Sequence, residues 1–474
     1  MNLRLNFSKS QVSFLKLPTL LLFVLSLFTI SCNTEDTDII ETTGLQPTIV
    51  EVLEAFGSES TVTDAEFGKS KVKKPTFKTL NVALAQTGLA GTVSSKRLTV
   101  FAPTDAAFAK YGLNQKNIVS ELGVETLTSI LLYHVVSGTI FSGDLPVNGF
   151  VPTLNGAFVE VNVNSGVTIN NATVIIADRE ARNGVIHAID DVLFPPTNNL
   201  VALASSFDPE FSVLLAAATN AGLADTLAKN GPYTVFAPTN QAFMDFFKVA
   251  SVEAAIDVVN GLTAEDLAPI LLYHVVDGVV FSTNLSNGFV PTLNGAAVNV
   301  TLDSGVMIND ANVIGANVQA TNGVVHVIDK VLLPPSSNLV DLASSFDPEF
   351  SVLLAAATKA GLADTLTNDG PFTVFAPTNQ AFMDFFKVAS VEAAIDAVNG
   401  LTAEDLAPIL LYHVVAGRVY SSDLSSGPVT TLYGSFDLNL DTLTIDDNAM
   451  LVPGLLNVQA TNGVIHVIDS VLIP

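Results

Sequence analysis

The chain has 474 residues, 46 of them acidic and 20 basic, so its formal net charge is −26. A polyanion repels the phosphate backbone, and nucleic acid is therefore excluded as an expected partner. Charged residues make up only 14% of the chain and apolar residues 49%, which is typical of folded domains rather than of a disordered acidic tail. The length predicts several separate cores, because one core rarely grows beyond roughly 250–300 residues.

The N-terminal segment has the features of an export signal. Basic residues precede an apolar run over residues 17–30, which is shorter than the ~20 residues that a membrane-spanning helix needs. The sole cysteine, Cys32, directly follows Ser31, and the order T-I-S-C resembles a bacterial lipoprotein box. That resemblance implies cleavage before Cys32 and lipidation of its sulfur. We expect a lipoprotein-type signal peptide over residues 1–31 and an acidic tether over residues 32–46.

The acidic tether also bears on where the protein is displayed. Its sequence, N-T-E-D-T-D after Cys32, is similar to a signal with which some bacterial lipoproteins reach the outer cell surface. Acyl chains hold a protein to a membrane through about 0.8 kcal/mol per buried methylene, without any spanning helix. We therefore expect an exported protein that is lipid-anchored in the outer membrane and exposed at the surface. A periplasm-facing or a secreted protein is the alternative.

The rest of the chain repeats one unit three times. The repeated strings are V-F-A-P-T, L-L-Y-H-V-V and N-G-V-[IV]-H, which begin at Val100, Val235 and Val374, at Leu131, Leu271 and Leu410, and at Asn183, Asn322 and Asn462. This period of about 140 residues is long enough for each unit to bury its own core. We expect three domains over residues 47–196, 197–335 and 336–474, with an insertion at 57–75 in the first. Residues 338–424 differ from residues 199–285 at only twelve of 87 positions.

In chain order, the third unit begins with predicted helices and ends with predicted strands. Apolar spacing over residues 339–362 predicts helices interrupted near Pro348, and residues 372–376 read as a strand. Thr378 or Asn379 is expected to cap the next helix, and residues 402–405 resemble a capping box. Residues 412–415 and the run after Asn462 are expected to be strands. Helices followed by strands predict an α+β fold.

The sequence also predicts the type of two turns. Asn155-Gly156 and Asn294-Gly295 each lie between strand-like runs. This dipeptide favours a type I′ hairpin turn, in which both residues have positive φ.

Together, these motifs resemble the fasciclin-type domain. T-V-F-A-P-T, Y-H-V-V and N-G-V-[IV]-H-x-I-D occur in this order in all three units and cover nearly everything after residue 47. The resemblance implies a β-wedge of about seven strands packed with several helices, an extracellular adhesion role and no cofactor. It also implies partner binding near the Tyr-His motif, which in this chain comprises Tyr133, His134, Tyr273, His274, Tyr412 and His413.

The histidines raise the question of a metal site. Each unit has one in the Tyr-His motif and one in its last strand, His187, His326 or His466. Zinc needs three or four protein ligands, and the aspartate three residues after each strand histidine projects to the opposite strand face. We therefore expect hydrogen-bonded imidazoles in or beside the core, and no metal.

No enzyme motif is found in the sequence, and we expect a non-enzymatic surface protein. Its partner would be an extracellular protein or a polysaccharide. The lipid anchor would be its only contact with a membrane. The protein would be a monomer whose domains follow one another like a string of beads. The alternatives are a polysaccharide-binding module, a spacer without its own ligand, and an unrecognised hydrolase.

Overall fold

A computed structural model describes residues 46–56, 74–164 and 166–474. The expected signal peptide, Cys32, nearly all of the acidic tether and residues 57–73 of the insertion lie outside these residues. Within the described part of the chain, no helix is both long and apolar enough to cross a membrane.

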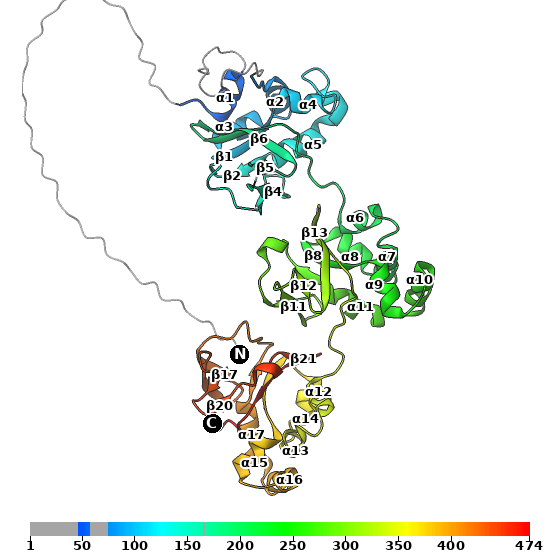
Figure 1. Ribbon diagram of the computed structural model, residues 1–474, viewed down its shortest axis with the longest axis vertical. Coiled ribbons are helices and arrows are strands. Elements are labelled where there is room, and N and C mark those ends of the chain that lie inside the picture. Colours follow the sequence, from blue (N-terminus) through cyan, green and yellow to red (C-terminus); the bar gives the residue numbers. More distant parts are fainter. Residues whose placement is uncertain (1–45, 57–73, 165) are drawn as a thin grey trace, which may run out of the picture. The chain divides into compact units, whose positions relative to one another are not determined.

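The first domain combines helices with one seven-stranded sheet (Figure 1). Its helices are α1 (Ile49–Ala55), α2 (Lys78–Gln86), α3 (Ala90–Ser95), α4 (Asp105–Ala109) and α5 (Ile118–Tyr133). Its strands are β1 (Leu98–Pro103), β2 (Val135–Ser137), β3 (Gly149–Pro152), β4 (Phe158–Asn162), β5 (Thr168–Ile169), β6 (Ala172–Ala181) and β7 (Gly184–Ile189). The sheet order is β2-β1-β7-β6-β5-β4-β3, in which only β1 and β7 pair in parallel.

The second domain repeats this plan. Its helices are α6 (Leu200–Ser206), α7 (Ser212–Asn220), α8 (Ala224–Lys229), α9 (Asn240–Phe247), α10 (Val252–Gly261), α11 (Ala264–Tyr273) and the 3₁₀ turn η1 (Ser282–Asn284). Its strands are β8 (Tyr233–Pro238), β9 (Val275–Asp277), β10 (Gly288–Pro291), β11 (Ala297–Thr301), β12 (Met307–Ile308), β13 (Ala311–Ala320) and β14 (Gly323–Ile328). The sheet order is again equivalent, β10-β11-β12-β13-β14-β8-β9.

The third domain has the same helices but a divided sheet. Its helices are α12 (Leu339–Ser345), α13 (Ser351–Lys359), α14 (Ala363–Asn368), α15 (Asn379–Phe386), α16 (Val391–Asn399), α17 (Ala403–Tyr412) and the 3₁₀ turn η2 (Pro453–Leu455). Its strands are β15 (Phe372–Pro377), β16 (Val414–Ala416), β17 (Gly427–Thr431), β18 (Gly434–Asn439), β19 (Thr444–Ile445), β20 (Ala449–Met450), β21 (Val458–Ala460) and β22 (Gly463–Ile468). The turn η2 interrupts the long strand of the other domains, leaving two four-stranded sheets.

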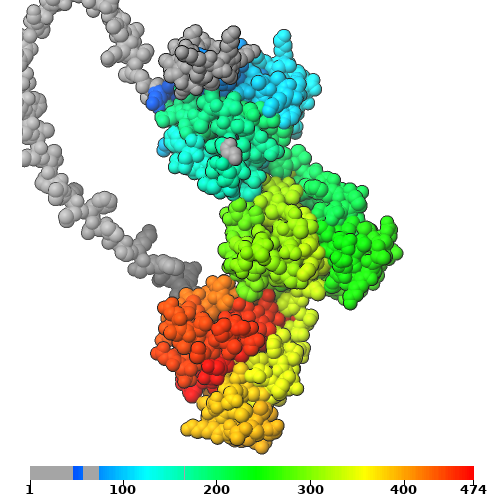
Figure 2. Space-filling model, in the orientation of Figure 1, coloured from blue at the N-terminus to red at the C-terminus, as the bar shows by residue number. Residues whose placement is uncertain are grey.

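The predicted α+β class is therefore confirmed. In each domain the parallel strand pair is almost fully buried between the helices and the rest of the sheet, as in β7, whose six residues are all buried. Figure 2 shows the third domain as one body in which yellow helical residues adjoin orange and red strand residues. One apolar cluster of this domain accordingly draws on Leu339 and Phe350 from the helical side and on Ile465 from the sheet.

One asparagine in each domain joins the first helix to the body of the domain. In the third domain, Asn462 Oδ1 accepts the backbone N–H of Leu339 at 2.9 Å. Its Nδ2 donates to the carbonyls of Leu366 and Asp369, at 2.9 and 2.8 Å. Asn183 and Asn322 make equivalent bonds. The first helix of each domain is thus held by the strand turn at the far end of the same domain.

Several local predictions can be compared directly with the structure. Helices α12 and α13 are interrupted around Pro348 as expected, and β15 spans the predicted strand. Thr378 caps α15, because its Oγ1 accepts the N–H of Ala381, and the capping box before α17 is present.

The type I′ assignment was wrong. Gly156 and Gly295 have positive φ, at 97° and 95°, but Asn155 and Asn294 do not. Each Asn side chain instead donates to the preceding helix: Asn155 Nδ2 reaches Ser129 of α5, and Asn294 Nδ2 reaches the Pro269 carbonyl of α11. The turn is therefore shaped by contact with the helix as well as by the hairpin.

Candidate functional site at the Tyr-His motif

The Tyr-His motif lies at the end of a helix. Tyr273 is the last residue of α11, His274 is its C-cap, and β9 begins only at Val275. The same holds at Tyr412 and His413 in the third domain. The prediction that Tyr412 starts a strand was therefore wrong: the apolar run continues without a break while the backbone changes from helix to strand within it.

Both ring nitrogens of the motif histidine are bonded to backbone groups. His274 Nδ1 donates to the Ile270 carbonyl at 2.8 Å, and its Nε2 accepts the N–H of Leu332 at 2.9 Å. A carbonyl can only accept and an N–H can only donate, so these partners select the neutral Nδ1–H tautomer. His134 and His413 have the same arrangement. Burial lowers the pKa of all three motif histidines from 6.5 to about 4.

The tyrosine of the motif ties the same helix to the sheet. The Tyr133 hydroxyl donates to the Phe158 carbonyl at 2.7 Å, and the Tyr273 hydroxyl donates to the Ala297 carbonyl at 2.8 Å. Asn170 and Asn309 in turn donate to these hydroxyls at 3.2 Å. Burial raises the pKa of both tyrosines.

The third domain differs at this hydroxyl. Asp446 replaces the asparagine, and its carboxylate lies 3.0 Å from the Tyr412 hydroxyl, which also lies 2.9 Å from the Ser435 carbonyl. Burial, followed by the hydrogen bond and the negative charge of Asp446, raises the pKa of Tyr412 to about 12. The hydroxyl is thus held in its protonated, donating form.

The strand histidines are also fully bonded. His326 Nε2 lies 2.9 Å from the Val280 carbonyl, and its Nδ1 accepts the N–H of Asn317 at 3.4 Å. His187 and His466 repeat these contacts. The prediction of satisfied imidazoles is confirmed. Because each ring nitrogen is engaged with the backbone, none presents a lone pair to a ligand, and the described residues contain no group of three or more potential metal ligands.

The six residues predicted to bind a partner are buried. Their exposed fractions are at most 6%: Tyr133, His134, Tyr273, His274, Tyr412 and His413. Partner binding at this motif stays a prediction. If it occurs, it must use neighbouring exposed residues, such as Leu293, Leu432 and Tyr433 in the adjoining turn, which are 40%, 42% and 48% exposed. The sequence offered one signal for this surface, because a leucine stands directly before the Asn-Gly or Tyr-Gly dipeptide of each turn.

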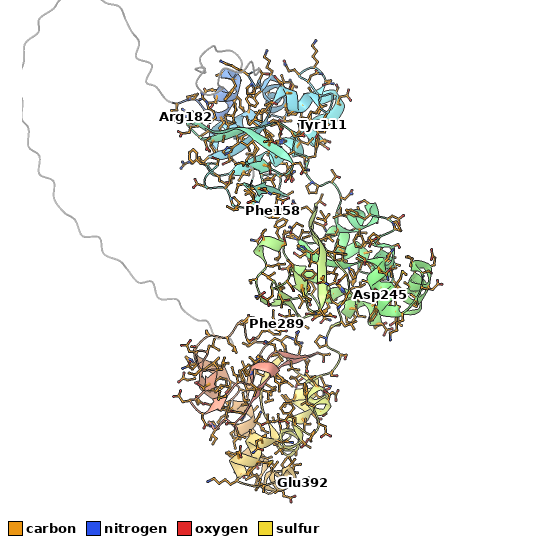
Figure 3. All side chains as sticks on the ribbon, viewed as in Figure 1. Tyr111, Phe158, Arg182, Asp245, Phe289 and Glu392 are labelled. Carbon is orange, nitrogen blue, oxygen red and sulfur yellow. The ribbon has the colours of Figure 1, made fainter. Side chains whose placement is uncertain are left out.

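Sequence reasoning missed that two of the motif tyrosines, Tyr133 and Tyr273, support contacts between successive domains. The Phe158 carbonyl that Tyr133 bonds also accepts from Gln319 Nε2 at 2.9 Å, and Phe158 N–H donates to Gln319 Oε1 at 3.1 Å. The Phe281 ring stacks on Phe150 with centroids 3.8 Å apart. Phe158 is labelled in Figure 3. These contacts join the first and second domains.

The same contacts recur between the second and third domains. Ala297 exchanges two hydrogen bonds with the Gln459 amide, at 3.0 and 2.8 Å. The Tyr420 ring stacks on Phe289, with centroids 4.7 Å apart, and its hydroxyl bonds Gln459 and the Ala297 N–H. Figure 3 labels Phe289. We call each set of one glutamine and two stacked rings a domain joint.

Comparison with known proteins identifies the class of protein. The fasciclin domain family model matches residues 75–195, 209–334 and 348–474. These segments include all three Tyr-His motifs and most of the described structure. The chain therefore belongs to the fasciclin-domain family and carries three such domains in tandem.

Individual relatives are similar to parts of the chain. The transforming growth factor-beta-induced protein ig-h3 of Sus scrofa is 33% identical over 258 residues, which are 53% of this chain and 35% of that protein. The immunogenic protein MPB70 of Mycobacterium bovis is 39% identical over 142 residues, 29% of this chain and 69% of that protein. The chain thus spans about a third of the length of ig-h3.

Solved structures also match part of the chain, and one of them illustrates the similarity. It is a FAS1 domain pair from the insect cell adhesion molecule fasciclin I, and the match has 24% identity and a TM-score of 0.27. The match covers 54% of this chain and 96% of that one.

Proposed function

We propose that the protein is a non-enzymatic adhesion protein that presents three fasciclin domains to an extracellular protein or polysaccharide. Cys32 anchors it by lipid in the outer membrane, and the described domains face the cell exterior. The observation that carries this proposal is the tandem repetition of one domain whose histidines are all bonded within its own structure.

The state of the histidines supports a role without catalysis. A general base must have an accessible nitrogen within reach of its substrate. In this chain all six imidazoles bond backbone groups, and the motif histidines are at most 1% exposed. None of the six histidines is therefore placed to act as a general base.

Repetition supports a role in binding. The second and third domains are identical at 75 of 87 compared positions, so the two domains present nearly the same surface twice. Two linked weak sites raise the effective concentration of the second, and avidity can exceed the single-site affinity by ~10²–10⁴. Weak contacts through the turns at Leu293 and Leu432 would gain most from this effect.

A binding survey of the mature full-length chain tests the proposal. The chain is applied to an array of extracellular matrix proteins and polysaccharides, and cells displaying it are tested for adhesion. We expect saturable retention on one class of partner, weakened when Leu293 and Leu432 are both replaced by Asp. Retention by polysaccharides alone would favour the polysaccharide-binding alternative. If no surface on the array retains the chain and cell adhesion is unaltered, the spacer alternative would be supported. Turnover of a substrate would refute the non-enzymatic proposal.

A further inference from the structure

The second domain contains an apolar cavity between its helices and its sheet. The cavity has a volume of about 320 Å³ and lies under the first helix, α6, where Leu200, Leu214 and Val325 are among its lining residues. The equivalent space in the third domain, lined by Leu339, Leu353 and Ile465, holds about 60 Å³. Two domains that are nearly identical in this part of their sequence thus differ about fivefold in the volume enclosed.

An insertion closes the space in the third domain. Between the strand positions Val313 and Val318 of the second domain lie four residues, among them Gly315. The equivalent positions in the third domain, Leu451 and Val458, are separated by six residues that include η2. From this segment, Val452 and Leu455 pack against the apolar cluster of α12 and the sheet. The corresponding segment of the second domain lines the cavity with Ile314 and with Gly315, which has no side chain to fill it.

The first domain carries larger side chains at the positions of Gly315 and Val318. Ile176 occupies the position of Gly315, opposite Ala188 rather than Val327, and packs against the core. Arg179, which replaces Val318, lies over the Phe56 ring, with its guanidinium carbon 5.6 Å from the centroid.

The cavity mouth of the second domain has no equivalent cover. Phe207 stands where the first domain has Phe56, at the C-cap of the first helix. Phe207 is 47% exposed and Ile314, across the mouth, is 61% exposed. Phe346, the counterpart in the third domain, is only half-buried and packs against the core cluster there. Exposed apolar side chains at the rim of an apolar cavity point to a ligand that enters between them.

The lining defines the chemistry of that ligand. Among the lining residues only Glu210, Thr239 and His274 have polar side chains. The Thr239 hydroxyl caps α9, and both nitrogens of His274 are bonded to backbone groups. A ligand with a buried polar group would lose its hydrogen bonds to water without replacement. Glu210 is exposed, and its charge, added to the net charge of −26, disfavours an anionic head group at the mouth.

The volume sets the size of the ligand. About 320 Å³ is near the lower limit for small-molecule pockets. It accommodates about ten methylene-sized groups if each takes roughly the 30 Å³ of a liquid water molecule. We propose that the cavity of the second domain binds one alkyl chain of a neutral molecule, with the chain inside and the head group outside near Glu210. The third domain carries a largely filled version of the same site, of about 60 Å³.

A fluorescence titration of the full-length chain tests this site. The neutral probe N-phenyl-1-naphthylamine should bind with a stoichiometry of one and be displaced by 1-decanol, and decanoate at neutral pH should displace it at least tenfold less effectively. Absence of saturable probe binding, or failure of 1-decanol to displace it, would overturn the proposal. Equal displacement by decanoate would refute the assigned role of Glu210.

Two matched variants locate the site. Gly315→Ile combined with Val327→Ala copies the first domain's pair, and losing the Cγ atoms of Val327 removes the 3.3 Å contact that a Cβ at Gly315 would make with Val327 Cγ2. This double variant should weaken probe binding at least tenfold while retaining the wild-type circular dichroism. Leu455→Ala opens the closed copy and should raise the stoichiometry towards two. Undiminished binding by the folded double variant would place the probe elsewhere and contradict the proposal.

Discussion

At the scale of the residue, the motif histidine is a structural cross-link. It joins the last turn of a helix to the chain that follows the final strand, as in the pair of bonds from His413 to Ile409 and Leu472. Its neutral form is required, because a protonated ring could not accept the Leu472 N–H. This residue therefore makes the fold sensitive to acid.

The pH dependence of stability should show this sensitivity. The pKa of each motif histidine is about 4 in the folded chain, against about 6.5 when unfolded, so the unfolded chain binds more protons between these values. The contribution of these histidines to the free energy of unfolding is complete above pH 6.5. It is lost as the pH falls towards 4 and amounts to at most about 3 kcal/mol per histidine. Burial also lowers the pKa of the strand histidines, which adds in the same direction.

Thermal unfolding at pH 7, 6 and 5 measures the effect, and we expect the midpoint to fall at each step. A His413→Gln variant, whose amide still has a donor and an acceptor, should be less stable at pH 7 but should show a shallower pH dependence. A midpoint that stays constant from pH 7 to pH 5 would contradict the assignment.

Residue types alone predicted part of the site. Apolar neighbours on both sides of each histidine indicated a buried, bonded ring, which the structure confirms. The exchange of Asn309 for Asp446 beside the motif tyrosine could not be interpreted from the sequence, because these residues follow the motif by more than thirty positions and meet it only in the fold. The same reason hid the pairing of Phe158 with Gln319.

At the scale of the element, each domain depends on the attachment of its first helix. Helix α12 has only seven residues, too few to be stable alone in water. Asn462 supplies the bond to its first N–H and holds the end of α14. The sequence marked this asparagine only as the start of a strand, and the family match begins after α12, at residue 348.

Replacing Asn462 by Ala should destabilise the third domain by about 3 kcal/mol, because several backbone groups lose a buried partner at ~1–3 kcal/mol each. Chemical denaturation measures this loss. Asn448→Ala, at an exposed position of the same domain, is the matched control and should change stability by less than ~0.5 kcal/mol. Equal effects of the two substitutions would show that Asn462 does not hold the helix.

Predictions for whole elements succeeded where a period or a cap signal was strong. The capping box at Thr402 and the strand after Asn462 were recovered for this reason. The long strand of the second domain and its divided equivalent in the third could not be distinguished. Their difference depends on the two extra residues around η2, whose apolar side chains fill a space that only the folded domain defines.

At the scale of the whole molecule, the domain joints are directional. Each uses a glutamine and an aromatic ring from the later domain and a stacked ring from the earlier one. The first and third domains each have one face that is not used in an internal joint, and the corresponding residues on these two faces do not match this pattern. Glu180 of the first domain replaces the glutamine, and Pro428 of the third replaces the stacked ring. A carboxylate cannot donate to a carbonyl, so head-to-tail association of two chains lacks the contacts of an internal joint.

Sedimentation tests this consequence. We expect the mature chain to remain monomeric at tens of micromolar, and Glu180→Gln combined with Pro428→Phe to produce measurable self-association. A wild-type chain that forms dimers over this range would show that the ends are compatible after all.

Loosening an internal joint should change how the domains move. Gln319→Glu removes the donor to the Phe158 carbonyl and brings a negative charge within reach of that oxygen. Small-angle scattering should show a broader distribution of distances, with unfolding midpoints of the individual domains unchanged. Gln241→Glu, on the exposed face of α9, is the control and should leave the distribution as it is. An identical distribution for Gln319→Glu and wild type would mean that the joint contributes nothing.

The proposed function depends on several domains acting together on one partner. The most direct measurement compares the full chain with the third domain alone, residues 336–474, on a surface coated with the partner found in the binding survey. We predict that the full chain dissociates more slowly and binds with an apparent affinity ~10²–10⁴ higher. Equal dissociation rates and affinities for the two would contradict the proposal that repetition is the basis of function.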